Sequence, residues 1–272
     1  NSDGSLVKAT GTVNVNAGEK FKLDIVCNPW YYPAESLKLV WTSTNADIAE
    51  VDEYGNVKIK DTKGSAQISA TLYENGIIAS SANVLLRVQE PFTISNYTLT
   101  RYHGNGGVVK IPDDKNINAI GEEAFKDNDN ITKIIIPRTV TQISEKAFIN
   151  CKALKEVYFI SEETIKPADA KLSTIRRRAF YNCTALEKID FSNCKVITLD
   201  AEVFAGCVSL KEVVNMTNIG TMNDRAFYGC KSLERVDATG LHICGESVFE
   251  NCTSVNELIT GAYTAIGKRA FY

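Results

Sequence analysis

The chain has 272 residues, of which 44% are hydrophobic, so it is long enough for one to two soluble domains with buried cores. Its 30 basic and 33 acidic side chains give a formal charge of -3, which argues against a broad basic surface for nucleic acid. No apolar run approaches the roughly 20 residues that span a bilayer, so we expect no direct membrane insertion in this segment. The first residues lack the basic and apolar regions of a signal peptide.

Residues 6–90 alternate apolar and polar side chains in short runs, such as Phe-Lys-Leu-Asp-Ile at 21–25. Gly, Asn and Pro interrupt these runs, as at Asn28-Pro29 and Asn75-Gly76, and provide the backbone angles that turns need. Several short strands at this spacing favour a β-sandwich over residues 1–90.

The segments at 40–45 (Val-Trp-Thr-Ser-Thr-Asn), 48–52 and 64–70 carry a more specific signal. They resemble the bacterial Ig-like domain, group 2, and the resemblance covers about residues 6–90. It implies an immunoglobulin-like sandwich. In surface proteins such domains mostly act as spacers, and some in adhesins bind partners.

From about residue 117 the chain repeats one unit, IxxxAF followed by xxCxxLxxVxF. Its phenylalanines are 22 to 24 residues apart, with one spacing of 32: Phe125, Phe148, Phe180, Phe204, Phe227, Phe249 and Phe271. Alternation in the LxxVxF run predicts one short strand per unit, and the Ala-Phe-x-x-Cys segment should return the chain across the opposite side. A unit this small buries its apolar face only against its neighbours, so the repeat predicts a stacked solenoid with a short-stranded parallel sheet.

This repeat resembles the BspA-like class of leucine-rich repeats, found in many surface proteins of Bacteroidetes, treponemes and some protists. Five units carry the pattern well, whereas the first has Asn128 where the cysteine is expected. We assign 91–116 to a linker and N-terminal cap, and 117–272 to about six repeats plus a partial one. The resemblance implies an extracellular or cell-surface location and adhesion to host matrix or to other bacteria, with a signal peptide or lipid anchor segment absent from this chain.

Few residues suggest catalysis or metal binding. The two histidines, His103 and His242, lie in no spacing typical of a nucleophile pair or a metal site, so we predict no enzyme activity and no cofactor. One cysteine column recurs in the repeat: Cys151, Cys183, Cys207, Cys230 and Cys252. Stacked side chains run parallel and do not converge on a metal, so we predict buried free thiols without disulfides or a metal site.

The repeat strands should line a concave face, where leucine-rich repeats usually hold partners. The outward column before the central apolar residue alternates in charge: Lys133, Glu156, Lys188, Glu212, Arg235 and Glu257. Opposite charges on neighbouring strands pair at about 5 Å, each exposed pair contributing a few tenths of a kcal/mol. The column fits either a self-neutralised structural surface or a polar protein-binding face, and it argues against DNA, RNA or heparin there.

The next outward column contains Ile135, Tyr158, Asp190, Val214, Asp237 and Ile259. Tyr158, Val214 and Ile259 are candidate anchors, because apolar and aromatic anchors carry most interface energy. Surface Val and Ile also occur for β-propensity alone, so a purely structural role is the alternative. Together with Asp190 and Asp237 they form our candidate partner-binding set on the repeats.

A second candidate surface is the aromatic loop Trp30-Tyr31-Tyr32 between two prolines. These side chains could stack on a sugar, contact a protein or pack on their own sandwich.

We therefore favour a cell-surface or secreted binding protein that presents its repeats to a host-matrix or bacterial surface protein. The alternatives are a carbohydrate-binding accessory protein that uses the aromatic loop, and a purely structural stalk.

Overall fold

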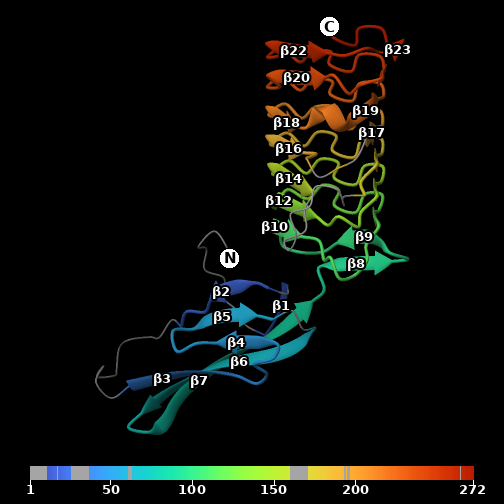
Figure 1. The fold of residues 1–272 in the computed structure, drawn as a ribbon. Coiled ribbons are helices and arrows are strands. Elements are labelled where there is room, and N and C mark those ends of the chain that lie inside the picture. The colour runs from blue at the N-terminus through green and yellow to red at the C-terminus, as the bar shows by residue number, and fades with distance from the viewer. Residues whose placement is uncertain are drawn as a thin grey trace. The chain divides into compact units, whose positions relative to one another are not determined.

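The computed structural model describes residues 11–16, 18–25, 37–60, 63–159, 171–192, 194, 197–263 and 265–272. The chain forms two compact units, which divide between Pro91 and Phe92. Regular structure in the described residues is almost entirely β, with a short 3-10 helix η3 (Met216–Asn218) and no α-helix (Figure 1). None of the helical segments described is long and apolar enough to cross a membrane. The predicted mainly-β fold class is confirmed.

The N-terminal unit has two sheets. One contains, in spatial order, β1 (Gly11–Asn16), β7 (Ile77–Gln89), β6 (Gly64–Glu74) and β3 (Leu37–Ser43); the other contains β2 (Lys20–Lys22), β5 (Asn56–Ile59) and β4 (Ala49–Val51). β1 runs parallel to β7, and the other pairs are antiparallel. This layout follows from the short alternating runs of the sequence.

Both sheets contribute to one core in the N-terminal unit. Ile68 of β6 and Leu86 of β7 are buried in the same cluster as Val57 and Ile59 of β5. The ring of Trp41 packs against this cluster. A core shared by two sheets is a sandwich arrangement, while the resemblance to the bacterial Ig-like domain stays a prediction.

The C-terminal unit is a solenoid of stacked coils with strands on two sides (Figure 1). The LxxVxF segments form β12 (Ile131–Ile136), β14 (Glu156–Phe159), β16 (Lys188–Asp190), β18 (Glu212–Val214), β20 (Arg235–Ala238) and β22 (Glu257–Thr260). A further strand on this side, β10 (Gly107–Lys110), lies within residues 91–116, before the first repeat. Neighbouring strands from β10 to β18, and β20 with β22, pair in parallel, as expected when each coil repeats the path of the one before.

A nine-stranded sheet forms the second side of the solenoid. In chain order it contains β8 (Phe92–Ser95), β9 (Thr98–Tyr102), β11 (Ala119–Ile120), β13 (Gln142–Ile143), β15 (Thr174–Ile175), β17 (Ile197–Leu199), β19 (Ile219–Met222), β21 (Ile243–Cys244) and β23 (Ala265–Ile266). Our prediction of one strand per unit was therefore incomplete. Most of these strands have two to four residues, which is too short for alternation to show in the sequence.

The Ala-Phe turns stack as well. The N–H of Phe148 donates to the carbonyl of Ala179 at 2.7 Å, and the N–H of Asn150 donates to the carbonyl of Tyr181 at 2.9 Å. From Phe125 to Phe271, neighbouring rings in the repeat column have centroids 4.7–5.5 Å apart. Burying one such ring contributes about 1.5–3 kcal/mol, so this column is a major part of the core.

The cysteine column lies beside these rings. Each thiol donates to the carbonyl of a phenylalanine in the preceding coil, over 3.0–3.2 Å. Cys151, Cys183, Cys207 and Cys230 are buried and Cys252 is half-buried, so the predicted burial of the column is confirmed for its first four members. In the first unit, Asn128 instead accepts hydrogen bonds from the backbone of Asn130 and Ile131.

Candidate functional site

The outward side of the repeat strands, called here the repeat-strand face, displays the two predicted columns in register. Lys133, Glu156, Lys188 and Glu212 are paired strand to strand, and so are Ile135, Tyr158, Asp190 and Val214. The intervening side chains, Ile134, Val157 and Ile189, are buried. Alternation therefore places the polar column outward because its neighbours fill the core.

Three predicted ion pairs are formed on this face. The ammonium nitrogen of Lys133 lies 3.1 Å from a carboxylate oxygen of Glu156, and that of Lys188 lies 3.0 Å from one of Glu212. The Nε of Arg235 lies 3.1 Å from a carboxylate oxygen of Glu257. Their side chains are 35–58% exposed, so each pair contributes only about 0.2–1 kcal/mol. The carboxylate of Glu212 raises the pKa of Lys188 by accepting its hydrogen bond. The charges neutralise one another locally and leave little net field on this column.

Tyr158 is the largest aromatic group in the outward columns. The ammonium of Lys133 lies 4.3 Å from the centroid of its ring. Ile135 is its partner on one side and Asp190 is its partner on the other. All three side chains are half-buried, so the ring is held in position while part of it still meets solvent.

Asp190 and Asp237 already hold local turns. The carboxylate of Asp190 accepts hydrogen bonds from the N–H of Ser192 at 2.8 Å and from the Ser192 hydroxyl. The carboxylate of Asp237 accepts from the N–H of Thr239 at 3.3 Å and from its hydroxyl at 2.7 Å. These are the turn contacts expected of aspartate at a strand end.

We expected one parallel sheet along the whole repeat, and this was wrong. The structure has a five-stranded sheet that ends at β18 and a separate pair, β20 with β22. Asn215 adopts a left-handed backbone with φ 54°, ends β18 and leads into η3. Val214 therefore lies at the last strand of the first sheet, and Ile259 belongs to the second.

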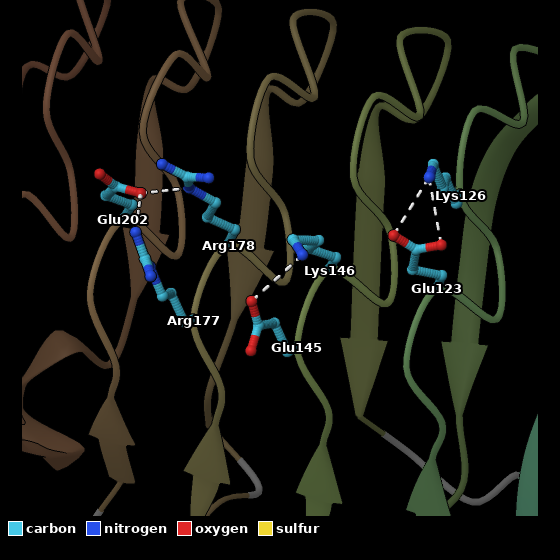
Figure 2. A network of polar contacts seen from close by, with 7 residues as sticks. All are labelled: Glu123, Lys126, Glu145, Lys146, Arg177, Arg178 and Glu202. Atoms are coloured by element: carbon cyan, nitrogen blue, oxygen red, sulfur yellow. Dashed lines mark hydrogen bonds and ion pairs between the residues drawn. The ribbon is translucent and has the colours of Figure 1, made fainter.

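A polar network on the Ala-Phe turns, called here the turn face, was not predicted from the sequence (Figure 2). The ammonium nitrogen of Lys126 lies 3.1 Å from a carboxylate oxygen of Glu123. The carboxylate of Glu202 forms ion pairs with both Arg177 and Arg178. The guanidinium of Arg178 lowers the pKa of Glu202 by donating a hydrogen bond to it. The usable signal was the recurrence of charged residues directly before Ala-Phe.

Backbone geometry marks the same turn face. The residue before the Ala or Val of each Ala-Phe motif has a positive φ of 54–61°: Glu123, Lys146, Arg178, Glu202, Arg225, Ser247 and Arg269. Glycine or asparagine usually occupies such positions. The charged side chains here are therefore not explained by backbone preference.

The aromatic loop predicted from Trp30, Tyr31 and Tyr32 lies outside the described residues. In the part of the chain that is described, no group of three or more His, Cys, Asp or Glu side chains is placed to hold a metal.

Comparison with protein families matches residues 93–170 and 173–272 to the BspA type leucine rich repeat region, in six copies. A leucine rich repeat protein of T. pallidum has a similar solved structure, with 24% identity and a TM-score of 0.54, over 65% of this chain and 81% of that one. A leucine rich cell surface protein of Faecalibacterium prausnitzii gives 24% identity and a TM-score of 0.41, over 62% and 52%.

A leucine-rich repeat protein of Eubacterium ventriosum gives 21% identity and a TM-score of 0.42, over 76% of this chain and 50% of that one. The chain thus spans about half the length of these last two proteins. No curated protein matches the sequence significantly. At these identities, the likeness to the T. pallidum protein supports the fold alone.

Proposed function

Because the chain belongs to the BspA-type leucine-rich-repeat family, we propose that it is a cell-surface or secreted binding protein that presents its repeat-strand face to a protein partner. Repeat proteins of this kind generally act as interaction scaffolds and not as enzymes. The partner class that we propose is a host matrix protein or a bacterial surface protein. Within this proposal the N-terminal unit acts as a spacer.

The observation that carries the proposal is the setting of Tyr158. Its ring is half-buried next to Ile135 and lies 4.3 Å from the ammonium of Lys133. A tyrosine that is already held in place loses little conformational entropy when a partner covers it. Tyrosine is also among the residues that contribute most to protein interfaces. We therefore assign the main anchor to Tyr158.

The neighbouring residues on the repeat-strand face would supply selectivity. Pairs such as Lys188 with Glu212 are already satisfied, so a partner gains little affinity from them. They would disfavour a partner whose own charges do not match the alternating pattern. Val214 and Ile259 would add apolar contact, while the carboxylates of Asp190 and Asp237 would accept hydrogen bonds at the strand ends.

The test is binding of the whole chain to an array of purified matrix and bacterial surface proteins. The test variant carries Tyr158→Ala and Ile259→Ala. The matched control carries Thr198→Ala and Ile243→Ala on the nine-stranded sheet, where both side chains are at least partly exposed. We expect the test variant to lose at least tenfold in affinity, about 1.4 kcal/mol, and the control to lose less than twofold.

Binding that survives in the test variant, or that falls equally in the control, would overturn the assignment to this face. If the chain binds no protein on the array, the alternative of a purely structural stalk would be favoured. Thermal unfolding of each variant shows whether the fold is intact.

A further inference from the structure

Alternate coils of the solenoid carry an arginine and a tyrosine on the turn face. The guanidinium carbon of Arg178 lies 5.4 Å from the ring centroid of Tyr181. The corresponding distances are 5.9 Å for Arg225 with Tyr228 and 5.9 Å for Arg269 with Tyr272. These three pairs are called here the Arg-Tyr row. The two intervening coils have Glu202 with Ala205, and Ser247 with Glu250, at the same positions.

Backbone hydrogen bonds keep the tyrosines of the row in one column. The N–H of Asn182 donates to the carbonyl of Ala205, and the N–H of Gly206 donates to the carbonyl of Tyr228, each over 2.9 Å. The phenylalanine that precedes Tyr181 lies 5.3 Å from its counterpart in the next coil, which lies 5.1 Å from the one after. The row therefore repeats about every 10 Å, which is the rise of two coils.

The tyrosines reach solvent, whereas the residue between the first two does not. Tyr181 and Tyr228 are half-buried, and Tyr272 is 81% exposed. Ala205, which lies between Tyr181 and Tyr228 in the column, is only 3% exposed. Aromatic groups thus meet solvent with a two-coil period, and a methyl group separates the first two.

We propose that the Arg-Tyr row binds an extended, neutral, β-1,4-linked polysaccharide, with one disaccharide for every two coils. In such a chain each sugar is turned over relative to the next, so the same face recurs at every second sugar. A tyrosine offers an apolar ring to the C–H groups of a sugar and a hydroxyl that can donate or accept. A guanidinium held by its tyrosine donates to sugar hydroxyls with little loss of conformational freedom.

The charges on the turn face favour a neutral polysaccharide over a charged one. The carboxylate of Glu202 pairs with both Arg177 and Arg178, so the first arginine of the row is already neutralised. Asp224 directly precedes Arg225 on the second pair's turn, and Glu246 and Glu250 lie on the coil between the second and third pairs; Asp224 and Glu246 are exposed. A polyanion would meet these carboxylates at each period, whereas sugar hydroxyls can bond to both signs of charge.

Isothermal titration calorimetry with defined oligosaccharides tests this assignment. Cellohexaose and chitohexaose represent the two sources of the linkage, glucose and N-acetylglucosamine, and hyaluronan represents a polyanionic glycan. The test variant carries Tyr181→Ala and Tyr228→Ala. The matched control is Tyr97→Ala, which removes a ring that is 61% exposed and outside the row.

We expect at least one hexasaccharide to bind more tightly than its trisaccharide. The test variant should weaken this binding at least tenfold, and the control should change it less than twofold. Tyr272→Ala removes a ring that is largely in solvent, so it should weaken binding about threefold without disturbing the core. The assignment fails if neither hexasaccharide binds at millimolar concentration, if both tyrosine variants bind as the wild type does, or if hyaluronan binds more tightly. Because the protein partner is proposed for a different face, its binding would not change with these variants.

Discussion

The thiol of Cys183 donates a hydrogen bond to the backbone carbonyl of Phe148, 3.1 Å away in the preceding coil. The same carbonyl accepts the N–H of Cys151 at 3.2 Å. Each buried cysteine of the column therefore links two coils and fills space beside the stacked rings. This double role explains why the column has cysteine instead of a larger apolar residue.

Replacing Cys183 by alanine should lower the free energy of unfolding by about 1–3 kcal/mol, because it leaves a small cavity and removes a buried donor. Cys252→Ala is the matched control, since that thiol makes the same contact but is only half-buried. Urea unfolding of both variants measures the difference. Equal losses at the two positions would show that the complete burial of Cys183 adds nothing to the stability of the fold.

The buried thiols should make stability fall at high pH. Burial raises the pKa of Cys207 from its usual 9.0 to about 12. The folded protein therefore resists ionisation of this thiol, whereas the unfolded chain ionises it above pH 9. The stabilisation is complete below about pH 9 and is lost towards pH 12, at about 1.4 kcal/mol per pH unit for each such thiol.

Urea unfolding at pH 8 and pH 10.5 measures this effect. Cys207→Ala should show a smaller fall in stability between the two pH values than the wild type. An identical fall in both proteins would mean that ionisation of Cys207 is not coupled to folding.

The left-handed backbone at Lys146, with φ 55°, predicts that a glycine variant is more stable than a valine variant at this position. Lys146→Gly should change the free energy of unfolding by less than about 1 kcal/mol, because glycine adopts this conformation without strain but is more flexible when unfolded. Lys146→Val should destabilise the fold by about 1–3 kcal/mol, since a β-branched residue is strained there. Thermal and urea unfolding decide the order, and a valine variant as stable as the glycine variant would refute it.

The ion pair between Lys188 and Glu212 should be weak and sensitive to salt. A double-mutant cycle with Lys188→Met and Glu212→Gln should give a coupling energy of about 0.2–1 kcal/mol at low salt. The coupling should shrink at 1 M NaCl, because both side chains are exposed to screening ions. A coupling that is large and independent of salt would show that this pair does more than set the register of the strands.

Much of the solenoid could be predicted from the sequence because one apolar pattern repeats. The spacing of Phe125, Phe148 and the later phenylalanines predicted the stacked coils. The alternation in the LxxVxF run predicted the outward columns and their ion pairs. The end of the first sheet at its fifth strand, β18, was not predicted. The strand β18 ends before Asn215, which has a left-handed backbone and occupies a position that is apolar in most other units.

The nine-stranded sheet and the turn face were missed for a different reason. Strands such as β13 and β15 have two residues each, so no alternation can be seen. In the Arg-Tyr row, each arginine precedes its tyrosine by three residues within one coil. The row itself arises only because coils that are more than 20 residues apart in the sequence stack on one another. Such relationships become visible only when the coils are superposed in space.

Site-specific photo-crosslinking shows which face of the solenoid contacts the protein partner. A photoreactive phenylalanine analogue replaces Tyr158 on the repeat-strand face or, as the control, Thr198 on the nine-stranded sheet. Each protein is irradiated with the partner that the binding array identifies. We expect a crosslink from position 158 that unlabelled wild-type chain competes away, and little or none from position 198. Crosslinking from 198 alone, or equally from both positions, would contradict the claim that the repeat-strand face holds the partner.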